Sequence, residues 1–273
     1  MQETAPTTAT KSHIRLNIRI SRNALSFSIA ERDAIGQAVY EPYIVKSGIS
    51  MAANLREAFR CSDLLMQEHR RSLVLTDSPT LLIPTEEFEP NDIDQLFHHT
   101  FSDHQAEVVL SQPIPNLDAM AVFSINKDLK TVIEDHFIDI RFIPLMLPVW
   151  NHLHKRSQQG TTKKLYGYFH DKKLEVFSFQ HNRFRFSNSY NLQNQRDAVY
   201  FLLFVWTQLG LNAEQDELHI IGQAPEEHEL MQTLRKYVQK VFLLTPSADF
   251  NEAPVTKVKG MPYDLTVLFV NGR

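Results

Sequence analysis

The sequence is poor in cysteine and has no long hydrophobic stretch. Its 273 residues include a single cysteine, Cys61, so the chain can form neither an internal disulfide nor a zinc site made of cysteines alone. The longest apolar run covers only residues 198–206, whereas a membrane-spanning helix needs about 20 residues. We therefore expect a cytoplasmic protein that does not insert into a membrane.

The sequence also lacks an excess of positive charge and the common catalytic motifs. Lys and Arg number 28 against 32 Asp and Glu, and the formal charge of -4 predicts no nucleic-acid partner. The chain has only eight glycines and contains no G-x-S-x-G, Walker loop or G-x-G-x-x-G motif. These absences argue against the common hydrolases, P-loop enzymes and dinucleotide-binding enzymes.

What the first half does contain is strand-like alternation of apolar and polar residues. The pattern predicts three antiparallel strands at residues 14–20, 25–29 and 37–45. A helix at 51–67 and a fourth strand at 73–76 follow. Ser50 is expected to cap the helix, and Cys61 to be a small buried side chain within it. A second set of short strands and a helix, up to about residue 137, reads as an insertion.

The second half repeats this order of elements. The corresponding strands and helices are predicted at residues 165–169, 174–179, 183–186, 196–211, 218–221, 226–241 and 241–245. Both halves therefore read β-β-β-α-β-α-β, which indicates an internal duplication. The apolar run at residues 198–206 is expected to be the most buried helix of this half, with Phe204 in the core.

These patterns predict an α/β protein of two lobes with mixed sheets and packed helices. The predicted first part is a loose tail at residues 1–12, followed by a first lobe at 13–156 with an insertion at about 77–137. A linker without apolar residues at 157–163 leads to the second lobe at 164–273.

Two such units in tandem resemble the actin-like ATPase fold, a duplicated ribonuclease-H-like architecture. The segments LVLTDSPTLLIP at 73–84, FIPL at 142–145 and MPYDL at 261–265 resemble a bacterial family of unknown function with this fold. The layout is more distantly similar to the cytoplasmic actin-like platform proteins of type IV pilus and type II secretion machines.

In actin-like ATPases, the turn between the first two strands of each lobe cradles phosphate with backbone N–H groups. Here the first turn, at residues 21–23, has neither glycine nor carboxylate, and the second offers Asp171 beside Lys172 and Lys173 but no glycine. A side chain in such a turn takes up the space that a phosphate needs.

The resemblance also implies an adenosine-binding loop after the fourth strand of the second lobe. The chain has one glycine there, Gly222, followed by Glu226 and Glu227, which would repel a nucleotide phosphate. A ribonuclease-H-type nuclease needs an acidic residue in the first strand, and residues 14–20 contain none. The densest histidine cluster, at residues 98–104, does not share one helix face, so no metal site is predicted.

The leading hypothesis is a catalytically silent actin-like scaffold or binding protein with an unidentified protein partner and no cofactor. The alternative is a divergent ATPase or sugar-kinase-like phosphotransferase acting in the interlobe cleft on ATP with magnesium. In that alternative Asp171 is catalytic, and Lys172, Lys173 and Gly222 bind the cofactor. A second alternative is an assembly platform that docks on an envelope protein, and a small-molecule ligand in the cleft stays open in each case.

Overall fold

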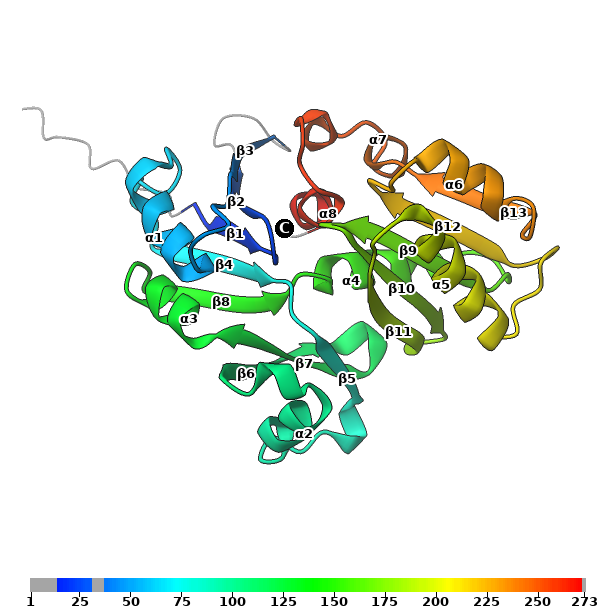
Figure 1. Ribbon diagram of the computed structural model, residues 1–273, viewed down its shortest axis with the longest axis horizontal. Coiled ribbons are helices and arrows are strands. Elements are labelled where there is room, and N and C mark those ends of the chain that lie inside the picture. The colour runs from blue at the N-terminus through cyan, green and yellow to red at the C-terminus, as the bar shows by residue number, and fades with distance from the viewer. Residues whose placement is uncertain (1–13, 31–36, 272–273) are drawn as a thin grey trace, which may run out of the picture.

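The computed structural model describes residues 14–30 and 37–271, and the predicted tail at residues 1–12 lies outside them. Two lobes lie side by side, and a smaller subdomain extends from the first lobe (Figure 1). Each lobe is built on a five-stranded sheet, and the subdomain has a three-stranded sheet.

The first lobe has the strand order β3-β2-β1-β4-β8. Its strands are β1 (Leu16–Ile20), β2 (Leu25–Ala30), β3 (Ala38–Tyr43), β4 (Arg71–Thr76) and β8 (Asp139–Pro144). The central strand β1 pairs antiparallel with β2 and parallel with β4, so the sheet is mixed. The helices α1 (Met51–Cys61) and α3 (Lys127–Glu134) pack together on its outer face.

The second lobe repeats this arrangement with the strand order β11-β10-β9-β12-β13. Its strands are β9 (Lys164–His170), β10 (Lys173–Gln180), β11 (Arg183–Asn191), β12 (Glu217–Gly222) and β13 (Lys240–Leu244). The helices α5 (Gln195–Gln208) and α6 (Glu227–Leu234) cover its outer face. The same order of five strands in both lobes confirms the predicted duplication.

The subdomain is inserted between β4 and α3 of the first lobe. It consists of β5 (Thr80–Pro84), α2 (Ile93–Thr100), β6 (Glu107–Ile114) and β7 (Ala119–Asn126), with the strand order β5-β7-β6. The chain then returns through α3 to the edge strand β8, which pairs parallel with β4.

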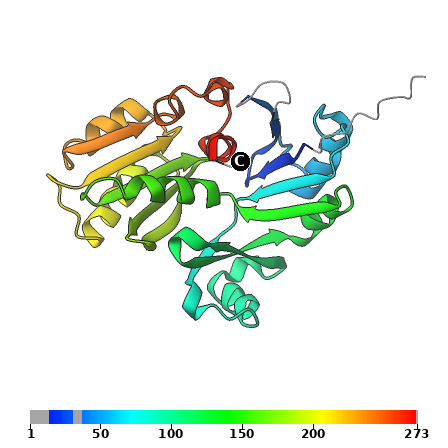
Figure 2. The same cartoon turned by 180° about the vertical axis from the view of Figure 1, so that it is seen from behind.

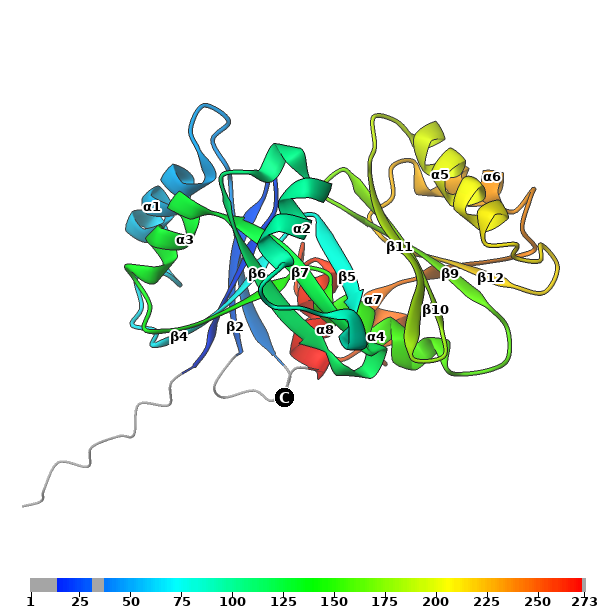
Figure 3. The same cartoon turned by 90° about the horizontal axis from the view of Figure 1, so that it is seen from below.

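Two helices fill the space between the lobes. The helix α4 (Leu147–Ser157) closes the first lobe, and after α7 (Pro246–Asp249) the helix α8 (Tyr263–Asn271) ends the described chain. They contact each other and lie between the inner faces of the two sheets (Figures 2 and 3). One apolar cluster runs through both faces and both helices, including Leu75, Trp150, Tyr168, Phe177 and Leu265. The lobes are therefore joined by a continuous core.

The structure corrects the sequence-based prediction for the helix that follows β3. The helix α1 ends at Cys61 instead of residue 67. At this end, the backbone N–H of Ser62 donates to the carbonyl of Ala58. The buried stripe of α1 continues through Ala58 to Ser62, so Cys61 lies about 100° away from it and is exposed. The expectation of a buried Cys61 is wrong.

The apolar run in α5 has two faces, which corrects a second prediction. Ala198, Leu202 and Val205 are buried at helical spacing against the sheet, whereas Phe204 is 46% exposed on the opposite side. Phe204 is therefore not a core residue. In the described part of the chain, no helix combines the length and the apolar character needed to cross a membrane.

Candidate functional site

A cavity of about 550 Å³ lies in the cleft between the lobes. The polar and aromatic residues that line it include Arg19, Tyr40, Asp171, Lys172, Gly222, Glu227 and Tyr263. Three of the four residues proposed for the ATPase alternative, Asp171, Lys172 and Gly222, therefore meet at one cavity. The fourth, Lys173, is absent from its lining.

Arg19 connects the two lobes at the floor of this cleft. It is the fourth residue of β1, and its guanidinium donates to both carboxylate oxygens of Asp264 in α8, with Nε–Oδ1 at 2.9 Å and Nη2–Oδ2 at 3.0 Å. Its Nη2 also lies 2.8 Å from Oδ2 of Asp171, in the turn between β9 and β10. The side chains of Arg19 and Asp264 are 4% and 0% exposed, so this is a buried pair of charges.

Tyr168 completes the environment of Asp264. Its hydroxyl donates to Oδ2 of Asp264 at 2.7 Å and accepts the backbone N–H of Asp264 at 3.3 Å. Burial would lower the pKa of Arg19, but the charge of Asp264 raises it well above its usual value. Burial, reinforced by the charge of Asp264, also raises the pKa of Tyr168. Arg19 is therefore charged and Tyr168 neutral at any physiological pH.

The second phosphate-type turn is held by charged contacts of its own. Asp171 and Lys172 both have positive φ, 45° and 65°, as a two-residue hairpin turn requires. Burial would raise the pKa of Asp171, but the hydrogen bond from His170 and the charge of Arg19 lower it below its usual range. Asp171 is thus a permanent anion that is already paired.

Two further residues cross the boundary between the lobes beside this turn. Nζ of Lys173 lies 2.7 Å from Oδ1 of Asp77, which directly follows β4. His170 lies next to Asp171 and Glu175, and although burial would lower its pKa, its bonds to these two carboxylates raise the pKa to about 9. Lys173, the third candidate for cofactor binding in the alternative hypothesis, thus forms an ion pair across the boundary between the lobes.

Three contacts in the cleft bear on the binding of ATP with magnesium. The guanidinium of Arg19 spans the space between the first strand of one lobe and the phosphate-type turn of the other. Gly222 lacks a side chain for a structural reason, because a Cβ there would lie 2.1 Å from the carbonyl oxygen of Phe169. Glu227 adds a negative charge to the lining.

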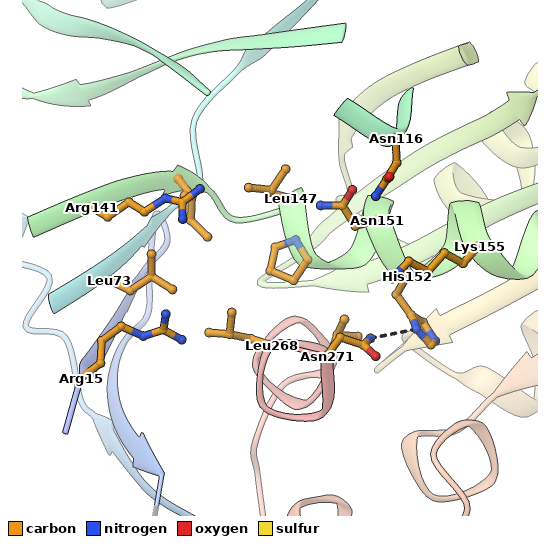
Figure 4. A pocket seen from close by; sticks show the side chains of 13 residues that line it. Arg15, Leu73, Asn116, Arg141, Leu147, Asn151, His152, Lys155, Leu268 and Asn271 are labelled. Atoms are coloured by element: carbon orange, nitrogen blue, oxygen red, sulfur yellow. Dashed lines mark hydrogen bonds between the residues drawn. The ribbon is translucent and has the colours of Figure 1, made fainter. Parts of the chain in front are cut away.

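A second cavity, of about 360 Å³, lies on the other side of α8, and we call it the basic pocket (Figure 4). Its lining residues are Arg15, Leu73, Asn116, Arg141, Ile143, Leu147, Pro148, Asn151, His152, Lys155, Val267, Leu268 and Asn271. Arg15, which precedes β1, and Arg141 on β8 point into it from the same sheet face, with Leu73 between them (Figure 4). The lining includes no carboxylate.

The two arginines of the basic pocket repel each other. Burial lowers the pKa of Arg15, and the positive charge of Arg141 lowers it further. Their hydrogen bonds within the described chain go only to neutral amides, from Arg15 to Asn17 at 3.2 Å and from Arg141 to Gln112 at 3.2 Å. On the facing helix α4, Oδ1 of Asn151 is buried without a hydrogen-bond partner.

One wall of the basic pocket is anchored through Asp249, at the end of α7. Nε2 of His152 lies 2.8 Å from Asp249 Oδ2, and Nδ1 accepts a hydrogen bond from Asn271 at 3.0 Å (Figure 4). Arg156 and the hydroxyl of Tyr263 bond to the same carboxylate. Burial and the charges of Arg156 and Lys155 lower the pKa of His152 to about 4, so it is neutral at pH 7.

The two lobes with the same strand order, and the subdomain inserted in the first, define a protein of the actin-like ATPase fold. The chain belongs to a family of proteins of unknown function, DUF3822, whose sequence pattern matches residues 3–241. No curated protein matches it.

Among the solved structures that resemble the chain over most of its length are the following two. A protein from Bacteroides thetaiotaomicron VPI-5482, described as having an actin-like ATPase fold and unknown function, is 27% identical with a TM-score of 0.81. The match covers 94% of this chain and 96% of that one. A PilM-PilN type IV pilus biogenesis complex matches at 11% identity and a TM-score of 0.52, over 86% and 89% of the two chains. Both structures support the actin-like fold.

The residues that organise the cleft were missed in the sequence analysis. Arg19 is one of the polar residues of the alternating strand predicted at residues 14–20, and Asp264 is noted only within the MPYDL segment. A charged residue on the polar side of a first strand gives no sign that a distant helix will bury it. The basic pocket was missed for the same reason, since Arg15 and Arg141 lie 126 positions apart.

Proposed function

We propose that this chain is a cytoplasmic actin-like binding protein that does not use ATP, and that it recognises an acidic segment of a protein partner in the basic pocket. The observation that carries the proposal is the pairing of Arg19 with Asp171 and Asp264. This pairing holds Asp171, the catalytic candidate of the ATPase alternative, against the guanidinium of Arg19.

The chemistry of the basic pocket favours a peptide over a bare anion. Arg15 and Arg141 offer guanidinium groups that match a carboxylate and pair with none in the described chain. The unpartnered Oδ1 of Asn151 needs a donor, which a peptide N–H supplies and an inorganic anion does not. Leu147 and Leu268 add apolar contact surface.

The likeness to a PilM-PilN complex is in keeping with a protein partner, because that structure contains an actin-like protein bound to another protein. It supports the class of function and leaves the partner of this chain to be identified by experiment.

The divergent ATPase is the second candidate. It is favoured by one observation, that Asp171, Lys172 and Gly222 line the same cavity. We rank it lower because Asp171 is neutralised by Arg19 and His170, and because the backbone of Phe169 already accounts for the glycine at 222.

A pull-down from the native host with charge-reversal variants tests the proposal. The double variant Arg15→Glu/Arg141→Glu inverts the pocket, and Arg56→Glu, on the exposed side of α1, is the matched control. We expect wild type and Arg56→Glu to retain the same protein, which the double variant loses and which elutes with increasing salt.

The proposal fails if the double variant, with its fold verified by circular dichroism, retains the same proteins as wild type. It also fails if no protein is retained by wild type at low salt.

A further inference from the structure

Beyond the proposed binding function, three buried side chains at the boundary of the lobes have the composition of a metal site. They are Asp77, which follows β4 in the first lobe, His170 at the end of β9 and Glu175 on β10. Each offers one ligand atom, and these atoms lie within 4.8 Å of one another. The side chains are 6%, 3% and 9% exposed. From this geometry we propose that Asp77, His170 and Glu175 bind a divalent transition-metal ion that links the two lobes.

Two of the three residues have an atom that the protein leaves without a hydrogen bond. Oδ2 of Asp77 and Nε2 of His170 are both buried without a hydrogen bond, and the nearest carboxylate oxygen to Nε2 is Oε1 of Glu175 at 3.5 Å. Buried polar atoms normally have hydrogen-bond partners, so Oδ2 of Asp77 in particular leaves a place for a bound cation. Lys173 uses only Oδ1 of Asp77, which leaves Oδ2 available as a ligand.

The orientation of His170 matches that of a metal-binding histidine. Its Nδ1 lies 3.3 Å from Oδ2 of Asp171, so Nδ1–H donates to a carboxylate while Nε2 faces Glu175. Histidines that bind metals commonly donate their other ring N–H to a carboxylate, which fixes the tautomer and orients the ring. Binding displaces any proton on Nε2, because only neutral imidazole is a ligand.

The spacing is close to what metal coordination requires. Bonds of about 2.0–2.2 Å place neighbouring ligand atoms roughly 3.0–3.6 Å apart. Nε2 of His170 and Oε1 of Glu175 are already 3.5 Å apart. The widest separation needs a contraction of about 1 Å, which rotation of the Asp77 and Glu175 side chains can supply.

The charges of this region also favour a divalent cation. Four carboxylates meet there against two side chains with a permanent positive charge, namely Asp77, Asp171, Glu175 and Asp264 against Arg19 and Lys173. Their sum is -2 when His170 is neutral, so one divalent ion balances the cluster. A set of one imidazole nitrogen and two carboxylate oxygens suits Mn²⁺, Co²⁺ or Zn²⁺ better than it suits an ion that prefers thiolate ligands, such as Cu⁺.

The experiment uses the full chain without a histidine tag, stripped with EDTA and then dialysed against Zn²⁺ or Co²⁺. The wild type and the variants His170→Gln, Glu175→Gln and Asp77→Asn are compared, with His228→Gln, an exposed histidine on α6, as the control. Bound metal is measured by elemental analysis, Co²⁺ coordination by visible absorption, and stability by thermal melting.

We expect one ion per chain in wild type and His228→Gln, a melting temperature raised by several degrees, and affinity lowered by at least about ten-fold in each of the three ligand variants. The conservative Glu175→Gln variant keeps the proposal testable if another variant does not fold. The proposal is overturned if wild type retains no ion after dialysis, or if the ligand variants bind the ion as well as wild type does.

Discussion

Replacing Arg19 with methionine tests the energetic role of the ion pair in the cleft. The substitution keeps an apolar stem of similar length but leaves the carboxylates of Asp264 and Asp171 without their shared cation. The carboxylate of Asp264 is fully buried, and in the variant its side-chain hydrogen bond from the hydroxyl of Tyr168 would remain while its negative charge had no cation beside it. Breaking a buried pair by removing one partner typically costs about 3–5 kcal/mol.

That cost corresponds to a large change in melting temperature. Domains of about 150–250 residues lose roughly 2–4 °C per kcal/mol, so Arg19→Met should lower the melting temperature by roughly 6–20 °C. The exposed pair of Arg71 and Asp139, whose side chains are 64% and 65% exposed, provides the control, and Arg71→Met should cost less than about 1 kcal/mol.

A double-mutant cycle separates the pair from the individual side chains. Adding Asp264→Asn to Arg19→Met removes the uncompensated charge of Asp264. The loss of stability in the double variant should therefore be smaller, by about 1–3 kcal/mol, than the sum of the losses in the two single variants. The reasoning is refuted if Arg19→Met melts within about 2 °C of wild type, or if the two losses simply add.

Three further predictions concern single residues. The pKa of His152 is about 4 in the folded chain, whereas its ordinary value is 6.5, so between pH 6.5 and 4 the unfolded chain binds one more proton than the folded chain. The free energy of unfolding should therefore fall by roughly 1–2 kcal/mol, after allowing for solvent screening, as the pH drops from 6.5 to 4. Urea melts of wild type and His152→Asn should therefore converge toward pH 4, and parallel pH profiles would contradict this. Gly222→Ala should cost ~2 kcal/mol or more, because φ is +83° and the new Cβ meets the Phe169 carbonyl, whereas thermal melts of Gly48→Ala, where nothing lies within 4 Å, should show little change. Leu202→Ala should cost about 2–5 kcal/mol and Phe204→Ser less than about 1 kcal/mol in urea titrations, and a reversed order would mean that the other face of α5 is buried.

The repeated lobes were predictable because alternation and helical spacing are local signals. Apolar residues at every second position of β1, and the return of the same element order after residue 164, required no knowledge of distant contacts. The polar side of β1 is less predictable, because Asn17 and Arg19 on it are buried and Arg19 is covered by Asp264 of α8. Arg19 and Asp264 are separated by 245 positions, and no local pattern pairs residues at that distance.

The candidate site could be predicted only in part, for a related reason. Asp171 and Gly222 were found because the resemblance pointed to their turns, and both do line the cleft. Their neighbours decide what they do, and these neighbours come from other elements. Phe169 explains Gly222, and Arg19 neutralises Asp171. The orphaned atoms of Asp77 and His170 likewise appear only once two lobes are brought together.

The most direct test of the central claim, that side chains have replaced nucleotide in the interlobe cleft, is a thermal melt with about 5 mM Mg-ATP. A ligand at ten times its dissociation constant stabilises the folded state by about 1.4 kcal/mol, so this experiment detects any dissociation constant below about 0.5 mM. We predict no change in the melting temperature of wild type, because Asp171 is already paired with Arg19 and Glu227 adds negative charge to the lining of the cavity. A reproducible rise of several degrees that is lost in Asp171→Ala would contradict the account and establish the cleft as a nucleotide site.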